Sequence, residues 1–266
     1  MIFVQIAAYR DPQLIPTLED LFAKAHKPDD IRVGICWQYG PDETASEIFG
    51  DSRVSVIAIP SMESKGCCWA RHILQQMYNG EEYTLQLDSH HRFAQDWDKT
   101  LIEMLESLPC KPILTTYAPS YNPVDESRVH NPWVMDLDKS GEIPMFRPAY
   151  SNHTEPKPTM FFSGHFAFAR GEFIKEVPYD SELYFHGEEI TMAIRAWVNG
   201  YDLYHPHKVV LWHEYTRAGR VKQWDEHSDW WKIDQSSKEK VRKILSGEIE
   251  LGGIRTLEEY KQKAGI

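Results

Sequence analysis

Short apolar segments alternate with amphipathic ones through the first half of the chain. Five segments have the length and the β-branched composition of buried strands: 2–7, 31–37, 54–59, 83–87 and 113–116. Residues 14–25 carry apolar side chains at helical spacing, with Asp11 as the expected N-cap and Pro12 at the first helical position. Two more amphipathic helices are predicted over 71–78 and 97–108. This alternation predicts an α/β fold with a mostly parallel central sheet, whose ligands bind beyond the carboxyl ends of the strands.

The second half of the chain is less regular. Residues 119–158 are rich in Pro, Asn, Ser and charged residues. So long a stretch without periodicity is usually functional, and we interpret it as a segment that faces the substrate. Order returns with a strand predicted over 160–169, a helix over 188–199 that ends at Gly200, and a strand over 209–212.

Length and charge narrow the class of protein. The 266 residues suit one elaborated α/β domain, so we expect a catalytic domain over 1–220 and a helical extension over 221–266 that packs on it. A net charge of -11 and a pI near 5.5 argue against binding to nucleic acid or to an anionic membrane. The sequence shows neither a signal peptide nor an apolar run of membrane-spanning length. Its four cysteines have no metal-binding spacing, and we expect a cytoplasmic setting.

The segment that follows the fourth predicted strand carries the clearest chemical signal. The strand delivers Asp88, Ser89 and His90 to the edge of the sheet, where a carboxylate and an imidazole two residues apart can face one ligand. Such a pair is suited to a divalent cation. The three residues alone are equally compatible with Asp88 capping a turn and His90 lying on the surface.

A third cation ligand is sought among the later histidines. His213 follows the apolar end of another predicted strand, and His205 and His207 lie shortly before it. We choose His213. Mixed oxygen and imidazole ligands favour Mn²⁺, with Mg²⁺ as the alternative, and a cation that bridges a diphosphate would stabilise it as a leaving group.

Other polar positions are weaker candidates. Glu188 and Glu189 open the helix predicted over 188–199, where acidic residues either stabilise the helix dipole or face a sugar or acceptor hydroxyl. Gly164 interrupts a predicted strand, which indicates either close ligand approach or tight packing. Arg10 and Arg71 each lie where a cationic fork could meet phosphate or ribose oxygens.

Taken in order, these motifs resemble those of the glycosyltransferases related to the Skp1 polypeptide N-acetylglucosaminyltransferase, a group with the GT-A fold. They are also similar to those of the polypeptide N-acetylgalactosaminyltransferases. The matching segments are Ile6 to Pro12, Ala70-Arg71, Leu87 to His90, Arg92-Phe93, Trp97-Asp98, Gly187 to Glu189, Arg195, Gly200 to Asp202 and His213 to Tyr215. The likeness covers most of the chain up to about Arg220.

The resemblance implies a role for each matching position. Asp88, His90 and His213 would bind the metal, and Glu188 and Glu189 would be the catalytic carboxylates that position sugar and acceptor. The donor nucleotide-sugar would contact Ala7, Tyr9, Arg10, Arg71, Asp88, Ser89, Gly164 and His165. The implied reaction moves a sugar, with N-acetylglucosamine as our choice, from a UDP-sugar to the hydroxyl of a glycan or protein side chain, with retention of configuration.

Two other functions fit parts of the sequence. The same Asp and His ligands could serve a metal-dependent phosphoester or pyrophosphate hydrolase that uses water as nucleophile. The many Trp and Tyr residues could instead form a non-catalytic carbohydrate-binding surface.

Overall fold

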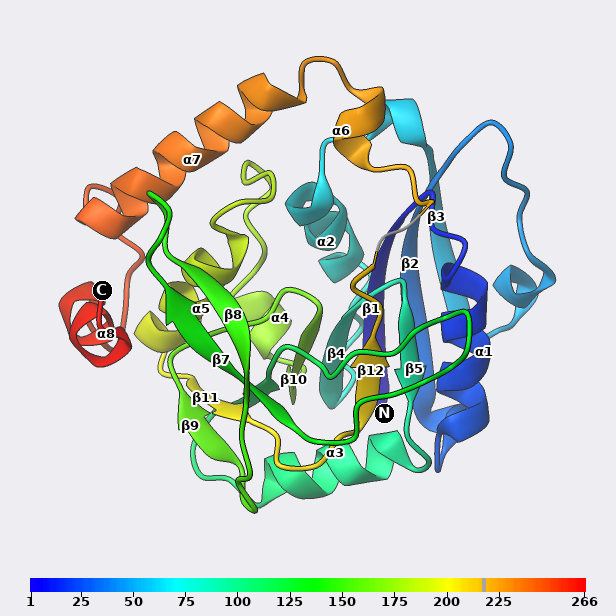
Figure 1. The fold of residues 1–266 in the computed structure, drawn as a ribbon, viewed down its shortest axis with the longest axis horizontal. Helices are drawn as coiled ribbons and strands as arrows, with labels where there is room; N and C mark the ends of the chain where they lie inside the picture. The colour runs from blue at the N-terminus through cyan, green and yellow to red at the C-terminus, as the bar shows by residue number, and fades with distance from the viewer. Residues whose placement is uncertain (217–218) are drawn as a thin grey trace.

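The computed structural model describes residues 1–216 and 219–266, which are organised around one large sheet (Figure 1). Across these residues the order of its strands is β3 (Val54–Pro60), β2 (Ile31–Tyr39), β1 (Ile2–Tyr9), β4 (Tyr83–Asp88), β10 (Phe166–Arg170), β6 (Pro112–Thr115), β11 (Asp202–His205) and β9 (Lys157–Thr159). Strands β3, β2, β1 and β4 are parallel neighbours, and β11 is parallel to β6. Strand β10 is antiparallel to both of its neighbours. The predicted α/β fold with a mostly parallel sheet is therefore confirmed.

Helices cover both faces of this sheet. The first four helices are α1 (Leu14–Lys24), α2 (Cys67–Gln75), α3 (Trp97–Glu106) and α4 (Phe173–Glu176), followed by α5 (Glu188–Val198), α6 (Gln223–Glu226), α7 (Trp230–Ser246) and α8 (Leu257–Ala264). Alternate residues of β1 separate the two sides, because Val4 and Ile6 pack with α1 and α3, whereas Ala7 packs with α2. A further core, which includes Val241 and Tyr260, joins α5 to the last two helices.

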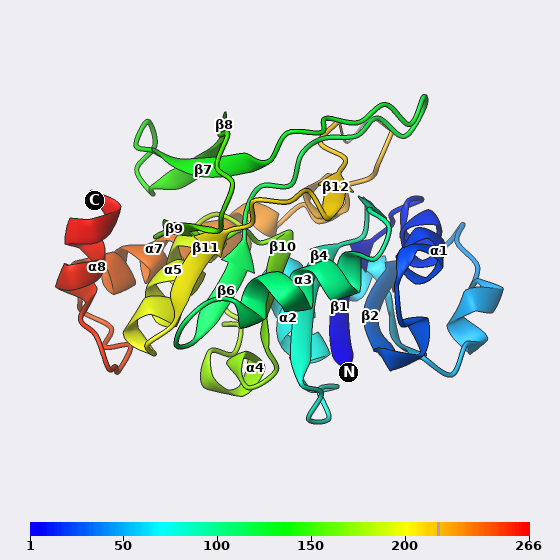
Figure 2. The ribbon, with the colours of Figure 1, turned by 90° about the horizontal axis from the view of Figure 1, so that it is seen from below.

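Two small sheets lie outside the large one. Strands β5 (His91–Phe93) and β12 (Leu211–His213) form an antiparallel pair, and β7 (Trp133–Asp138) and β8 (Met145–Tyr150) form a hairpin. Figure 2 shows the hairpin and β12 on the same side of the large sheet. The hairpin occupies the segment in which no strand was expected.

Several predicted boundaries are wrong. Helix α1 begins at Leu14 after Gln13, so Asp11 is not its N-cap and Pro12 is not helical. Helix α2 begins four residues before Arg71, and the strand expected over 160–169 is formed only from Phe166 onward. In the part of the chain that the structure describes, no helix is long and apolar enough to cross a membrane.

Candidate functional site

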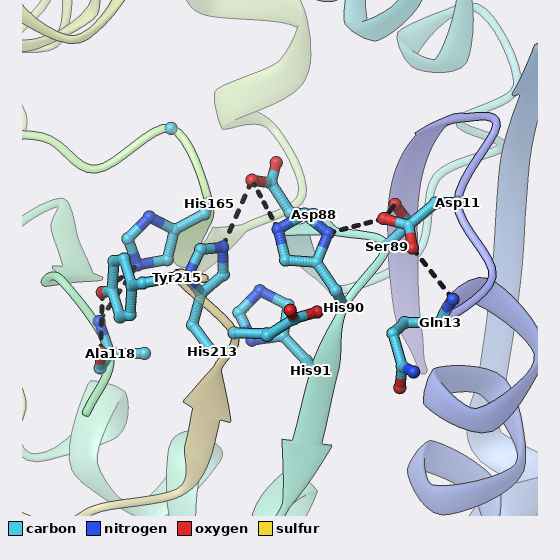
Figure 3. A network of polar contacts seen from close by, with 12 residues as sticks. Asp11, Gln13, Asp88, Ser89, His90, His91, Ala118, His165, His213 and Tyr215 are labelled. Atoms are coloured by element: carbon cyan, nitrogen blue, oxygen red, sulfur yellow. Dashed lines mark hydrogen bonds and ion pairs between the residues drawn. The ribbon is translucent and has the colours of Figure 1, made fainter. Parts of the chain in front are cut away.

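Three side chains from distant parts of the sequence converge at the carboxyl end of β4 (Figure 3). One ligand atom from each of Asp88, His90 and His213 lies within 4.8 Å of those of the other two. The Nε2 atoms of His213 and His90 lie 3.4 Å and 3.7 Å from the same Asp88 oxygen, Oδ2. Carboxylate and imidazole atoms around one point form a donor set that suits a divalent cation.

The pairing of two short strands brings His213 to this point. His90 directly precedes β5, and the register of β5 with β12 places His91 opposite His213. The backbone N–H of Glu214 also donates to the carbonyl of His90 at 3.1 Å. Thr17 of α1 fixes the loop from the other side, because its hydroxyl donates to the carbonyl of Ser89 and accepts from the N–H of His91.

Asp11 controls the orientation of His90. Its Oδ2 accepts hydrogen bonds from Ser89 Oγ at 2.7 Å, His90 Nδ1 at 2.7 Å and Arg220 Nη1 at 2.9 Å. Burial alone would raise the pKa of Asp11, but the hydrogen bond from His90 and the charge of Arg220 hold that pKa below its ordinary value. Because an ionised carboxylate can only accept, Nδ1 of His90 donates to Asp11, and Nε2 is the ring nitrogen that faces Asp88. That Nε2 is buried without a hydrogen-bond partner, which fits a cation ligand.

The neighbouring histidines are neutral. Burial lowers the pKa of His213 and of His165 well below the ordinary value. The backbone N–H of Ala118 donates to His165 Nε2 at 3.0 Å, so its Nδ1 proton faces Ser163 Oγ at 3.2 Å. Both nitrogens of His165 are thus occupied, and its ring stacks on that of His213 with centroids 4.1 Å apart. His165 packs against a candidate cation ligand and is not one itself.

Arg71 connects the cation ligands to α5. Its Nη2 lies 2.6 Å from Asp88 Oδ1, and its Nη1 pairs with Glu188. Burial would raise the pKa of Asp88, but the hydrogen bond from His213 and the charge of Arg71 bring that pKa well below its ordinary value. A Cβ atom at Gly164 would lie 2.8 Å from both Arg71 Nη1 and Glu188 Oε1. The glycine is therefore required by the packing of this ion pair.

The two carboxylates predicted at the start of α5 have different surroundings. Glu188 is buried, and besides Arg71 it accepts a hydrogen bond from the Tyr179 hydroxyl at 2.8 Å. Glu189 pairs with no cation in the described residues and accepts from Tyr117 Oη at 2.5 Å and from the N–H of Gly164 at 2.9 Å. Burial raises the pKa of Glu189 to about 7. Glu189 can therefore exchange a proton near neutral pH, whereas Glu188 is held in an ion pair with Arg71.

Two cavities meet at the cation ligands. The first, of about 160 Å³, is lined by residues that include Ala7, Tyr9, Ser89 and Trp224. The second, of about 320 Å³, is lined by residues that include Arg71, Gly164, His165, Glu188, Glu189 and Tyr215. Asp88 lines both cavities. The site can thus hold a ligand with two parts joined beside a cation.

Most of the residues predicted for the site lie in these cavities. Arg10 lines neither of them, because its guanidinium pairs with Asp42 and Glu226 at 2.5 Å each. Sequence reasoning missed Arg220, which lines the first cavity and has buried Nε and Nη2 atoms without hydrogen-bond partners. It also missed the contact of Asp11 with His90, since a carboxylate shortly before a helix has the sequence pattern of a cap.

Comparison with solved structures identifies the fold as that of GT-A glycosyltransferases. GalNAc-T7 with UDP, GalNAc and Mn²⁺ matches with a TM-score of 0.62 and 14% identity over 100% of this chain and 54% of that one. S. aureus TarS 1-349 matches with a TM-score of 0.63 and 15% identity over 99% of this chain and 69% of that one. Its complex with UDP-GlcNAc matches with a TM-score of 0.61 and 13% identity, over 99% and 70% of the two chains. The chain thus spans about half the length of GalNAc-T7.

A family model is more specific than these structural likenesses. The model described as Glycosyltransferase (GlcNAc) matches residues 1–47 and 39–264. The chain therefore belongs to this glycosyltransferase family. None of the curated proteins matches the sequence.

Proposed function

We propose that the protein transfers a sugar, with N-acetylglucosamine as the favoured one, from a UDP-sugar to an acceptor hydroxyl, with retention of configuration. Family membership supports a glycosyltransferase. The observation that carries the proposal is the convergence of Asp88, His90 and His213 between two cavities, because a nucleotide-sugar has two parts joined by a diphosphate that binds cations. A Mn²⁺ or Mg²⁺ ion held by these three residues would supply Lewis-acid stabilisation of the departing diphosphate.

The first cavity would receive the nucleotide. Ala7 and Tyr9 line it at the end of β1, and Trp224 lines it from α6. Arg220 is about nine-tenths buried and has N–H groups without acceptors, so phosphate oxygens would satisfy donors that the protein leaves unpaired. Asp11 and Glu214 hold this guanidinium in place from the protein side.

The second cavity would receive the sugar and the acceptor hydroxyl. In the reaction the bond from the anomeric carbon to the diphosphate oxygen breaks and a bond from that carbon to the acceptor oxygen forms. The hydroxyl proton leaves with the diphosphate in a front-face displacement. Glu189 would accept a hydrogen bond from the sugar or acceptor, whereas Glu188 would hold Arg71 against Asp88.

Thermal unfolding with UDP, in the presence and absence of Mn²⁺, tests this proposal. At a hundredfold excess of ligand over its dissociation constant we expect stabilisation by about 2.7 kcal/mol, and only when both are present. Slow hydrolysis of UDP-N-acetylglucosamine without acceptor should accompany binding. Turnover of phosphoesters that contain no sugar would favour a hydrolase, and the absence of a shift with every nucleotide diphosphate would refute the proposal.

A further inference from the structure

A row of aromatic rings leads from the cation ligands to the surface. Tyr215 packs against His213 with ring centroids 4.3 Å apart, and Trp133 lies next to Tyr215 at 5.9 Å with an interplanar angle of 31°. Tyr150 follows at 5.9 Å from Trp133, with the two ring planes nearly perpendicular at 86°. His213 is 3% exposed, Tyr215 is 37% exposed, Trp133 is half-buried, and Tyr150 at the outer end is 74% exposed.

The β7–β8 hairpin carries the outer part of this row. Its inner side is anchored, since Val134, Met135 and Phe146 are buried in the core. Tyr150 lies on this anchored hairpin but is itself largely exposed, so it contributes little to the buried core beneath. At the other end of β8, Met145 lines the second cavity together with Tyr215. The hairpin therefore forms one wall of the cavity in which the acceptor hydroxyl would react.

We propose that Tyr215, Trp133 and Tyr150 form the binding track for the acceptor, and that the acceptor is a neutral saccharide. This inference rests on the proposed transferase function. Aromatic rings present flat apolar faces that pack against the C–H face of a pyranose while its hydroxyls stay available for hydrogen bonding. Tyr215 packs on His213 and lines the second cavity, so a saccharide that reaches this innermost ring would bring its terminal hydroxyl into that cavity.

The strand edges of the hairpin argue against a peptide acceptor that binds as an added strand. Such binding needs free backbone groups along an edge. On β8, Pro148 has no N–H to donate. Opposite it on β7, the N–H of Met135 donates to His205 Nε2 at 3.2 Å. Recognition at this hairpin therefore falls to side chains, among which Met145 and Tyr150 are exposed.

Charge favours an uncharged saccharide. The second cavity contains the carboxylates of Asp88, Glu188 and Glu189, and only one arginine, Arg71, lines it within the described residues. The whole chain carries a net charge of -11. Arg71 is already paired with Asp88 and Glu188, so the described part of the lining offers an anionic acceptor no unpaired arginine or lysine, whereas a neutral sugar needs none.

Saturation-transfer NMR tests the proposal directly. The 266-residue chain, with UDP and diamagnetic Mg²⁺, is mixed with chitotriose, cellotriose, maltotriose and a glycine-flanked threonine peptide. We expect saturation transfer to at least one trisaccharide. The affinity for that trisaccharide should fall about threefold to tenfold in Tyr150→Ser and be retained in Tyr150→Phe, which keeps the ring. Trp231→Ser is the matched control, because Trp231 is 51% exposed on α7 and belongs to no part of the track.

Three outcomes would overturn the proposal: saturation transfer to the peptide alone, saturation transfer to none of the trisaccharides, or equal saccharide binding by Tyr150→Ser and the wild type. The affinities for UDP and Mn²⁺ are measured separately on the same protein preparations. Both should be unchanged in all three variants. Loss of nucleotide binding by the wild type would count against the transferase function and not against the track. Saccharide binding without nucleotide binding would leave the track standing.

Discussion

Replacing Asp11 by Asn should weaken cation binding although Asp11 itself is not a ligand. The substitution keeps the shape of the side chain but removes its charge. In the wild type one oxygen accepts from Ser89, His90 and Arg220, and the other accepts from the N–H of Gln13 at 2.8 Å. If the amide NH₂ replaces the first oxygen, the donors on Ser89, His90 and Arg220 face another hydrogen-bond donor and lose their acceptor. If it replaces the second, the Gln13 N–H loses its acceptor.

The size of the effect follows from these contacts. Loss of the partner that orients a metal-bound imidazole typically costs 10- to 100-fold in metal affinity, which is about 1.4–2.7 kcal/mol. Folding should also suffer, because among the described residues Arg220 would be left with Glu214 as its one carboxylate partner, at 3.6 Å. Breaking a buried pair costs about 3–5 kcal/mol, and Glu214 should keep the loss near the lower end.

Calorimetric titration of Mn²⁺ at saturating UDP measures the first effect, at a temperature where circular dichroism shows both proteins folded. Asp42→Asn is the matched control, since its side chain is 71% exposed and pairs with Arg10 away from both cavities. We expect the control to bind like the wild type. A Mn²⁺ affinity of Asp11→Asn within twofold of the wild type would refute the assigned role.

Two further predictions concern α5. Because the pKa of Glu189 lies near 7 in the folded protein against an ordinary 4.5, its ionisation opposes folding, and stability falls as pH rises from 4.5 to 7. Glu189→Gln should remove this loss of at most about 3 kcal/mol. Urea unfolding at pH 5 and pH 8 should therefore show a difference in the free energy of unfolding between variant and wild type that depends on pH. The same difference at both pH values would contradict the account. If 221–266 packs on the catalytic domain as we propose, Gly187→Ala should cost about 1–3 kcal/mol, since φ is +91° there and a Cβ would lie 2.5 Å from Val241 Cγ2. Gly50→Ala, with open space around it, is the control, and equal melting temperatures would count against this packing.

The regular elements could be predicted because their patterns are local. The short apolar runs that define the first parallel strands, and the spacing of leucines in α1, depend on few neighbours in sequence. The β7–β8 hairpin escaped prediction because its outer face is polar and exposed and β8 contains Pro148. Composition alone cannot distinguish such a hairpin from an irregular loop.

The site was predicted only in part, because only some of its contacts are local in sequence. Asp88 and His90 share one strand end, so their proximity follows from two residues of sequence. The place of His213 depends on the register of β5 with β12, and the choice among the later histidines rested on family resemblance. His205 instead bonds to the backbone of Thr115 and Met135. Asp11 and Arg220 meet across 209 residues, a separation at which no local signal exists.

The central claim is that Asp88, His90 and His213 bind one divalent cation together with the donor diphosphate. Electron paramagnetic resonance of free Mn²⁺, titrated with protein at saturating UDP, tests it most directly in the wild type and in His213→Ala. We predict one bound Mn²⁺ per wild-type chain and its loss in the variant, with UDP affinity falling in parallel. Undiminished binding of Mn²⁺ and UDP by a folded His213→Ala protein would contradict the claim.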